Sequence, residues 1–333
     1  MQGVARLSAE DRRVLFTESA AKSGLPALMI EKDFWVCWTL SRLYSIKGLP
    51  RLLFKGGTSL SKCFGLIQRF SEDIDLGIRR EDIGLAAEDC PSPKKGSSSQ
   101  KKARKRLRDA AASYVQDSLA PTLQTDFTAR LDVPVVLTTE STASEVVLFF
   151  EYPRALDAGA YGEGDYVKPA VRLELGARSD HYPTEEVQIS PEAAAHFPQA
   201  FTAPSCTVTA QAAERTLLEK ALIVHSAIAA GNFRRESSRH AYDLTAMHEG
   251  GVASRLTRKL YEDVAEHKRV FSDDKSAGEA PVKGIRMVPN GELRELLRAD
   301  YARMSEMFYG SPPSFDVIMG ALAALESRIN SME

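Results

Sequence analysis

The spacing of apolar residues changes several times along the chain and predicts both helices and strands. Apolar residues recur at helical spacing over residues 8–22 and again over 26–45. The apolar run Leu52–Phe54 then stops near two glycines, as a buried strand does where it meets a turn. Over residues 73–78 the period becomes two, which predicts a strand with one buried face.

The same patterns divide the rest of the chain into a strand-rich middle and a helical end. β-branched and apolar runs predict strands within 126–152, including Phe127–Leu131, within 166–176 and at 207–209, with Pro134 favouring an edge position or a break. Residues 178–203 and 272–289 are predicted as loops. Helices are expected over 212–228, 252–270, 291–308 and 314–330, with another beginning at 239–244. This order predicts an α+β fold with two domains, 1–210 and 211–333.

Composition excludes several classes of protein. The 333 residues are 44% hydrophobic and 26% charged, as in soluble globular proteins, and the net charge of −2 provides no global attraction to nucleic acid. The four cysteines form no CxxC pair, so we expect neither a zinc site nor a disulfide framework. The N-terminus does not resemble a signal peptide and no apolar run has the length of a membrane span, so we expect a cytoplasmic protein.

The candidate chemistry lies between residues 54 and 78. After the strand, Gly56 and Gly57 precede small hydroxyl residues, where free N–H groups favour an anion such as a phosphate. Asp73 and Asp75 share one face of the next strand, about 7 Å apart at their Cα atoms, and such a pair can hold Mg²⁺. The glycine turn alone is equally consistent with a plain turn, and an isolated Asp-x-Asp pair is more often a solvated strand face. Together, a phosphate-binding turn and a metal-binding pair indicate nucleotidyl transfer.

These segments resemble those of the AbiEii/AbiGii (MenT-like) nucleotidyltransferase toxin family of type IV toxin–antitoxin systems, which also act in abortive infection. The resemblance rests on Lys55–Lys62 with Arg69–Leu76, on the N-terminal Ile30–Val36, and on Thr216–Lys220, Arg239–Leu244 and the closing Tyr301–Phe315. It implies a nucleotidyltransferase-like mixed β-sheet flanked by helices, and a C-terminal helical bundle that completes the active site. The basic insertion near 94–108 departs from the family pattern and matches none of its motifs.

The resemblance implies Mg²⁺-dependent (or Mn²⁺-dependent) transfer of a nucleoside monophosphate from an NTP to an acceptor hydroxyl, expected at the 3′ end of tRNA, which would block translation. Its implied partners are the NTP, tRNA and a cognate antitoxin encoded nearby, with no membrane. The implied catalytic residues are Asp73, Asp75, Glu174, Lys220 and Asp243, of which Asp73, Asp75 and Glu174 would bind metal. The nucleotide would contact Lys55, Gly56, Gly57, Thr58, Ser59, Lys62 and Ser71.

Three of these assignments have plain alternatives. Glu174 alternates with apolar residues on a strand, so it is either a third carboxylate of the site or a surface partner of Arg172. Lys220 is flanked by apolar residues and would otherwise extend to solvent, and Asp243 would otherwise pair with Arg239.

The segment 94–108 holds eight basic residues and no acidic one, and is predicted to be a mobile Gly-Ser loop leading into a helix over about 100–119. It is either a solvated helix face or an RNA-binding arm. The candidate nucleic-acid contacts are Lys101, Lys102, Arg104, Lys105 and Arg106, together with Arg234 and Arg235 in a later basic turn.

Two other functions remain compatible with the sequence. A protein that binds an NTP without catalysis would use the same glycine turn and would act through protein contacts. A transferase that modifies protein hydroxyls would keep the chemistry and change the acceptor, although the basic segment favours RNA.

Overall fold

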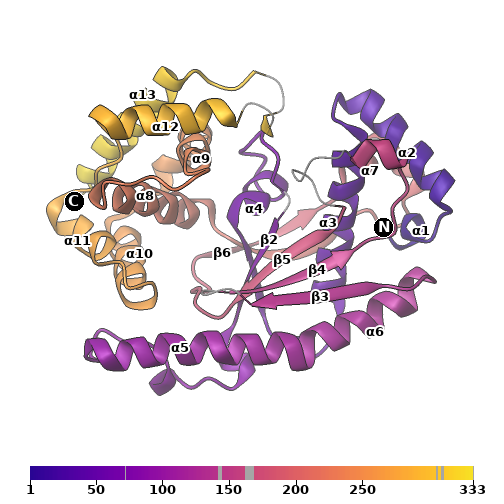
Figure 1. The fold of residues 1–333 in the computed structure, drawn as a ribbon, viewed down its shortest axis with the longest axis horizontal. Coiled ribbons are helices and arrows are strands. Elements are labelled where there is room, and N and C mark those ends of the chain that lie inside the picture. Colours follow the sequence, from indigo (N-terminus) through magenta and orange to yellow (C-terminus); the bar gives the residue numbers. More distant parts are fainter. Residues whose placement is uncertain (72, 142–144, 162–168, 305–306, 309–310, 333) are drawn as a thin grey trace. The chain divides into compact units, whose positions relative to one another are not determined.

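The computed structural model describes residues 1–71, 73–141, 145–161, 169–304, 307–308 and 311–332 (Figure 1). Its helices are α1 Gln2–Ala5, α2 Ala9–Ser23, α3 Ala27–Ser45, α4 Gly56–Lys62, α5 Ser97–Tyr114, α6 Ala120–Leu131, α7 Glu192–His196, α8 Ala213–Ala229, α9 Ser238–Glu249, α10 Arg258–Phe271, α11 Lys275–Lys283, α12 Gly291–Arg303 and α13 Phe315–Asn330. Its strands are β1 Leu52–Lys55, β2 Asp73–Ile78, β3 Val136–Ser141, β4 Val146–Glu151, β5 Val171–Gly176, β6 Thr184–Ile189 and β7 Cys206–Gln211. The expected α+β class is confirmed.

The chain forms two compact units, each assembled from segments that are distant in sequence. The first comprises Met1–Cys63, Glu72–Asp89 and Lys105–Ala210, and the second Phe64–Ser71, Cys90–Arg104 and Gln211–Glu333. The short segment Phe64–Ser71 therefore belongs to the helical second unit, although it lies between α4 and β2 of the first unit in the sequence.

The first unit contains a mixed seven-stranded sheet in the order β3-β4-β5-β2-β1-β7-β6. β2 pairs antiparallel with β1 and parallel with β5, whereas β3, β4 and β5 pair antiparallel. β3 is an edge strand and begins at Val136, two residues after Pro134, so the chain shows both the break and the edge position that the proline suggested. In β2, Ile74, Leu76 and Ile78 are buried and Asp73 and Asp75 are half-buried on the opposite face, so the predicted two-residue period is confirmed.

Aromatic packing joins α3 and α6 to one face of this sheet. Trp38 of α3 lies with its ring centroid 4.7 Å from that of Phe127 in α6, and Phe127 lies 4.8 Å from Phe150 in β4. Trp35 is likewise fully buried and contacts Phe150. Both tryptophans are core residues, and the helix that carries them is held rigidly against the strands that present the polar face.

The predicted strand at Phe127–Leu131 is wrong, because these residues end the helix α6. Leu123, Phe127 and Leu131 are the buried positions, and their spacing of four residues is that of a helix face. The apolar and β-branched content of the segment suggested a strand. The burial pattern shows that the helical period decides its structure.

Other predicted loops contain regular structure. The predicted loop 178–203 contains β6 and α7, and the predicted loop 272–289 contains α11, which is capped by Asp274 accepting from the Ala277 N–H. The Gly-Ser stretch is not a loop throughout, since α5 begins at Ser97. The strand predicted at residues 166–167 lies outside the described residues. α4 ends at Lys62, so Cys63, Phe64 and Ile67 lie beyond it.

The second unit is helical, as expected. α13 begins after Ser314, whose side chain accepts from the Val317 N–H, and it buries Ile318, Leu322 and Leu325. Segment 64–71 is joined to this unit by a hydrogen bond of 2.7 Å from the Phe70 N–H to the Met307 carbonyl. No helix in the described part of the chain combines the length and apolarity needed to cross a membrane.

Candidate active site

Three carboxylates and one arginine share the polar face of the central strands β2 and β5. In the parallel register Asp73 lies beside Arg172 and Asp75 beside Glu174. Because side chains alternate along a strand, all four lie on the face opposite Ile74 and Leu173. The structure therefore brings together the three carboxylates that the sequence singled out.

Arg172 links two of these carboxylates. Its Nη1 donates to Asp73 Oδ2 over 2.9 Å and also to Glu174 Oε1. The two interpretations of Glu174 are therefore compatible, because it lies next to Asp75 and is also paired with Arg172. Arg172 was predicted only as a partner of Glu174, and its bond to the neighbouring strand follows from the register of β2 and β5.

The crowding of negative charge affects protonation. Burial, followed by the charge of Asp75, raises the pKa of Glu174 to about 7, against the opposing effect of Arg172. Burial also raises the pKa of Asp73, while Arg172 opposes the shift. A raised pKa means that the ionised form of a carboxylate is disfavoured, and a cation bound nearby would stabilise that form.

The donor set fits a hard divalent cation. Mg²⁺ prefers carboxylate oxygens and is commonly held by one or two carboxylates, with substrate phosphates completing its coordination. Asp73 and Asp75 supply such a pair. Within the described residues no group of three or more His, Cys, Asp or Glu side chains is arranged to hold a metal ion, so the pair rather than a closed protein cage is the feature that fits.

Gly56 is required by the packing of Asp75. Gly56 begins α4 with a φ of +80°, and a Cβ added to it would lie 1.8 Å from Asp75 Oδ2. A side chain at this position would therefore displace the Asp75 carboxylate as well as strain the backbone. The glycine predicted to make room for a phosphate also makes room for a candidate metal ligand.

The other residues of the β1–α4 connection are largely engaged within the protein. Thr58 Oγ1 donates to the Asp73 carbonyl over 2.6 Å, which joins α4 to β2. Lys62 Nζ lies 2.6 Å from Asp33 Oδ1, and the other oxygen of Asp33 accepts from the Glu192 N–H. Ser59 is buried. Lys62 thus has a compensating carboxylate within the first unit.

Three further predicted residues are Lys55, Gly57 and Ser71. Lys55 ends β1 opposite Asp75. Gly57 is buried in the first turn of α4. Ser71 is half-buried and belongs to the second unit.

A buried charge cluster in the second unit joins residues from three segments. Asp243 on α9 is fully buried and accepts from Arg69 Nε over 2.7 Å and from Arg69 Nη2 over 2.8 Å. Lys220 Nζ on α8 lies 2.9 Å from Asp243 Oδ2. Two cations face one carboxylate, so the cluster has an excess positive charge that suits a phosphate-bearing ligand.

The charges determine how this cluster protonates. Burial acts to raise the pKa of Asp243, but Arg69 and Lys220 outweigh burial and hold it well below its usual range. Burial, followed by the positive charge of Lys220, lowers the pKa of the neighbouring His240, so this imidazole is neutral at pH 7.

Arg69 is the functional candidate that the sequence analysis missed. Arg69 begins one of the segments that resemble the family, but the sequence suggested no role for it. The partner that the sequence suggested for Asp243 was Arg239. Arg239 instead lies 3.9 Å from Glu236. Because Arg69 and Asp243 are 174 positions apart, no local spacing relates them, and only the fold pairs them.

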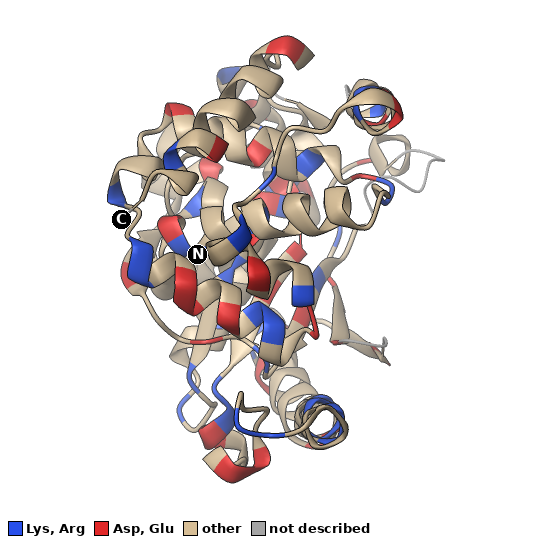
Figure 2. Cartoon of the chain, turned by 90° about the vertical axis from the view of Figure 1, so that its left-hand side faces the viewer, with Lys and Arg blue, Asp and Glu red and all other residues tan. Residues whose placement is uncertain are grey.

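Most of the predicted RNA-binding residues of α5 are already paired. Arg104 donates to the Val270 carbonyl and lies 3.1 Å from Asp273, Lys105 pairs with Asp109 and Arg106 with Asp89. Lys101 and Lys102 are exposed. Figure 2 shows basic and acidic positions interspersed along many of the visible helices.

Arg234 and Arg235 differ from the α5 residues. Both are exposed, and they line a cavity of about 390 Å³ with Phe233 and Arg303. Asp300, which also lines this cavity, accepts from the Glu236 and Ser238 N–H groups, both over 2.9 Å, and so fixes the basic turn. The side chains of the two arginines make no hydrogen bond or ion pair with the residues that the structure describes.

Comparisons with known proteins identify one matching family. The model of a nucleotidyl transferase family, the AbiEii toxin of type IV toxin–antitoxin systems, matches residues 38–321. No curated protein matches the sequence. Among solved structures the chain is similar to MenT4, a nucleotidyltransferase toxin from Mycobacterium tuberculosis H37Rv, with 19% identity, 96% of this chain and 87% of that chain covered, and a TM-score of 0.42. The family match includes both Asp73 and Asp243.

Proposed function

Because the chain belongs to the AbiEii family of nucleotidyl transferase toxins of type IV toxin–antitoxin systems, we propose that it transfers a nucleoside monophosphate from an NTP to the 3′ end of tRNA. The acceptor hydroxyl oxygen forms a bond to the α-phosphorus, the bond to the β-phosphate oxygen breaks, and pyrophosphate leaves. The observation that supports this proposal best is the Asp73–Asp75 pair, presented on a rigid sheet with Asp75 packed over Gly56.

The first unit supplies the metal ligands and the phosphate contacts in this proposal. Asp73 and Asp75 would hold Mg²⁺ or Mn²⁺, which would supply positive charge next to the triphosphate and the leaving group. Gly56, Gly57 and Ser59 contact the phosphates through the start of α4, with Lys55, Thr58 and Lys62 supporting this turn. Glu174 accepts the proton of the attacking hydroxyl or serves as a third carboxylate.

The second unit supplies positive charge in this proposal. Lys220 contacts the triphosphate and stabilises the departing pyrophosphate, because its charge is only partly compensated by an aspartate that it shares with Arg69. Asp243 positions Lys220 and does not touch the reacting atoms. Ser71, two residues before Asp73, is a further nucleotide contact.

The tRNA acceptor is inferred from the family resemblance, and the charge of the basic turn supports an RNA partner. Arg234 and Arg235 are exposed and unpaired among the described residues, and they share a concave surface with Phe233. Arginine with an aromatic ring is a combination that binds single-stranded RNA, through phosphate contacts and base stacking. Lys101 and Lys102 provide additional phosphate contacts. Addition of a nucleotide to the 3′ end would prevent aminoacylation and stop translation, and the family implies an antitoxin that prevents this.

The test is incubation of the purified protein with each α-labelled NTP, Mg²⁺ and total bacterial tRNA. We expect label on tRNA with the wild type, and none after addition of EDTA or with Asp73→Ala. The matched control is Asp263→Ala, which removes an exposed aspartate from α10 and should transfer normally. Tight NTP binding with no transfer would instead support the non-catalytic alternative, and label on protein would identify a protein hydroxyl as acceptor.

A further inference from the structure

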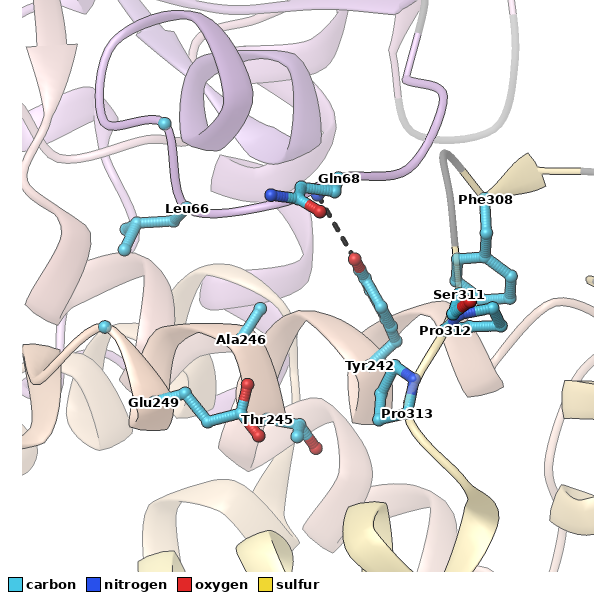
Figure 3. Close-up of a pocket in the computed structure, with 12 residues that line it drawn as sticks. Leu66, Gln68, Tyr242, Thr245, Ala246, Glu249, Phe308, Ser311, Pro312 and Pro313 are labelled. Carbon is cyan, nitrogen blue, oxygen red and sulfur yellow. Dashed lines mark hydrogen bonds between the residues drawn. The ribbon is translucent and has the colours of Figure 1, made fainter.

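A second cavity lies on the side of α9 that faces segment 64–71, and all of its lining residues belong to the second unit (Figure 3). It has a volume of about 410 Å³. We call it the α9 cavity; its lining includes Leu66 and Gln68, Tyr242 and Glu249 of α9, and Phe308. This volume is in the range of sites that bind small molecules.

Aromatic side chains form one wall of the α9 cavity, and they are fixed in place. The ring centroids of Tyr242 and Phe308 are 4.8 Å apart, and Phe308 also contacts Tyr301 at 5.6 Å. The Tyr242 hydroxyl accepts from the Gln68 N–H over 3.1 Å, as the dashed line in Figure 3 marks. A preorganised aromatic wall of this kind suits a planar ring such as a nucleobase, which stacks on aromatic side chains.

Glu249 supplies an uncommitted acceptor at the rim of the cavity. Its side chain is exposed and, within the described part of the chain, makes no hydrogen bond or ion pair. The Thr245 hydroxyl, in contrast, already donates to the Ala241 carbonyl. An ionised carboxylate can only accept hydrogen bonds, so a ligand group that pairs with Glu249 must be a donor.

The bases differ in whether they offer such a donor. Adenine and cytosine carry exocyclic amino groups, as does guanine, whereas uracil presents a carbonyl oxygen at the position where cytosine has its amino group. A carboxylate attracts the first kind of group and repels the second. Glu249 would therefore select amino-bearing bases against uracil.

The α9 cavity shares its backbone with the buried charge cluster. Tyr242 immediately precedes Asp243, and Gln68 immediately precedes Arg69, so the same two segments form the cavity wall and hold the cluster. A ligand in the cavity is thus bound by the elements that position Lys220. This arrangement suits a nucleotide, since its base and its phosphates need binding groups of different kinds.

We propose that the α9 cavity binds a nucleobase bearing an exocyclic amino group, and that Glu249 accepts a hydrogen bond from that group. The inference rests on the proposed nucleotidyl transfer, and it adds the recognition of the base. The base belongs either to the donor NTP or to the terminal nucleotide of the acceptor RNA. A hydrogen bond to a charged group gives a discrimination of about 10- to 100-fold.

The test compares the wild type with Glu249→Gln, whose amide can donate to a carbonyl oxygen as well as accept. One arm measures kcat/KM for the four NTPs with one RNA, and the other uses one NTP with RNAs ending in A, C or U. We expect the wild type to disfavour uracil by 10- to 100-fold in one arm, and the variant to reduce that preference about tenfold, mainly through KM. The matched control is Glu292→Gln, an exposed glutamate at the start of α12.

The arm that changes identifies the source of the base. If neither arm shows discrimination that Glu249→Gln reduces, the inference is overturned although transfer itself occurs. If the wild type transfers nothing, the proposed function fails, and calorimetric binding of the four NTPs and of RNAs ending in A, C or U decides the inference separately. In that case a preference against uracil in either series that the variant loses supports it, and equal preferences of the two proteins in both series overturn it.

Discussion

At the residue scale, the candidate site contains side chains of two kinds. Asp73, Asp75 and Glu174 were identified from the sequence because a two-residue period assigns side chains to a face of a strand. The sequence did not predict the hydrogen bond from Arg69 to Asp243, or the one from Arg172 to Asp73 on the neighbouring strand. In both cases the partner comes from another segment of the chain. A local pattern reveals which face a residue occupies, but not which distant charge lies opposite.

Substitution of Gly56 by alanine should disrupt catalysis more than folding. The new Cβ would lie within 1.8 Å of Asp75 Oδ2, so the carboxylate must move, and a displacement of about 1 Å at a catalytic group costs on the order of 100-fold in rate. We expect kcat/KM to fall by about that factor. Label transfer to tRNA measures it.

Gly84→Ala is the control for backbone strain. Gly84 has a φ of +78°, close to that of Gly56, but a Cβ there would meet no atom within 4 Å. Both variants should lose about 1–2 kcal/mol of stability, and only Gly56→Ala should lose activity. Equal activity of the two variants would show that the contact with Asp75 is unimportant.

Asp243→Asn should destabilise the protein in a pH-dependent manner. The variant leaves Arg69 and Lys220 buried without a counter-charge, which costs about 3–5 kcal/mol. Because the folded-state pKa of Asp243 is lowered, its stabilising effect is complete above the unfolded pKa of about 3.9 and is lost as pH falls towards the folded value.

Urea unfolding of the wild type and of Asp243→Asn at pH 7 and pH 3 checks this dependence. The difference in free energy of unfolding should be smaller at pH 3. Asp263→Asn, an exposed change on α10, should differ from the wild type by less than about 0.5 kcal/mol at both values. A difference that is the same at the two pH values would argue against a charge effect.

At the scale of elements, periodicity was reliable where one face is buried throughout. The helices α2, α3 and α13 and the strands β1, β2, β4 and β5 lie where the pattern placed them. One kind of error occurred where a strand-like composition conflicts with a helical spacing of buried residues, above all in α6. The other occurred where the apolar face of the helix is short, as in α11. In these segments tertiary burial selects the structure from two local possibilities.

An alanine scan along α6 should reveal a helical period. Phe127→Ala removes a ring that packs against Trp38 and Phe150 and should cost about 3–5 kcal/mol, and Leu123→Ala about 2–5 kcal/mol. The exposed neighbour Thr128→Ala should be nearly neutral. Denaturant unfolding measures each variant, and losses at alternate positions instead would indicate a strand.

At the scale of the whole molecule, 43 basic and 45 acidic residues nearly cancel, so binding of RNA depends on local groups. Most basic side chains of the α5 segment are neutralised by neighbours, whereas Arg234 and Arg235 are exposed and share one cavity. Fewer positive charges are therefore available to RNA than the eight basic residues of 94–108 suggest, and the exposed pair Arg234 and Arg235 lies outside that segment.

The double variant Arg234→Ala, Arg235→Ala should bind tRNA more weakly than the wild type, and its affinity should depend less steeply on the salt concentration. Loss of two phosphate contacts to single-stranded RNA should reduce the slope of log K against log salt by about 1.4. The control is Lys259→Ala, Lys283→Ala, which removes the same charge from lysines paired within their own helices. Titration of labelled tRNA at several salt concentrations measures both, and equal slopes would exclude the basic turn as a contact.

The sequence by itself determined the fold class, the buried faces of its long elements and the identity of the paired carboxylates, because each follows from the spacing of residues within one segment. Only the tertiary structure decided that Asp75 rests on Gly56, that Arg172 lies between Asp73 and Glu174, and that Arg69 and Lys220 share Asp243. These contacts join segments as many as 174 positions apart. They depend on strand register and helix packing, which arise when distant apolar faces are buried together.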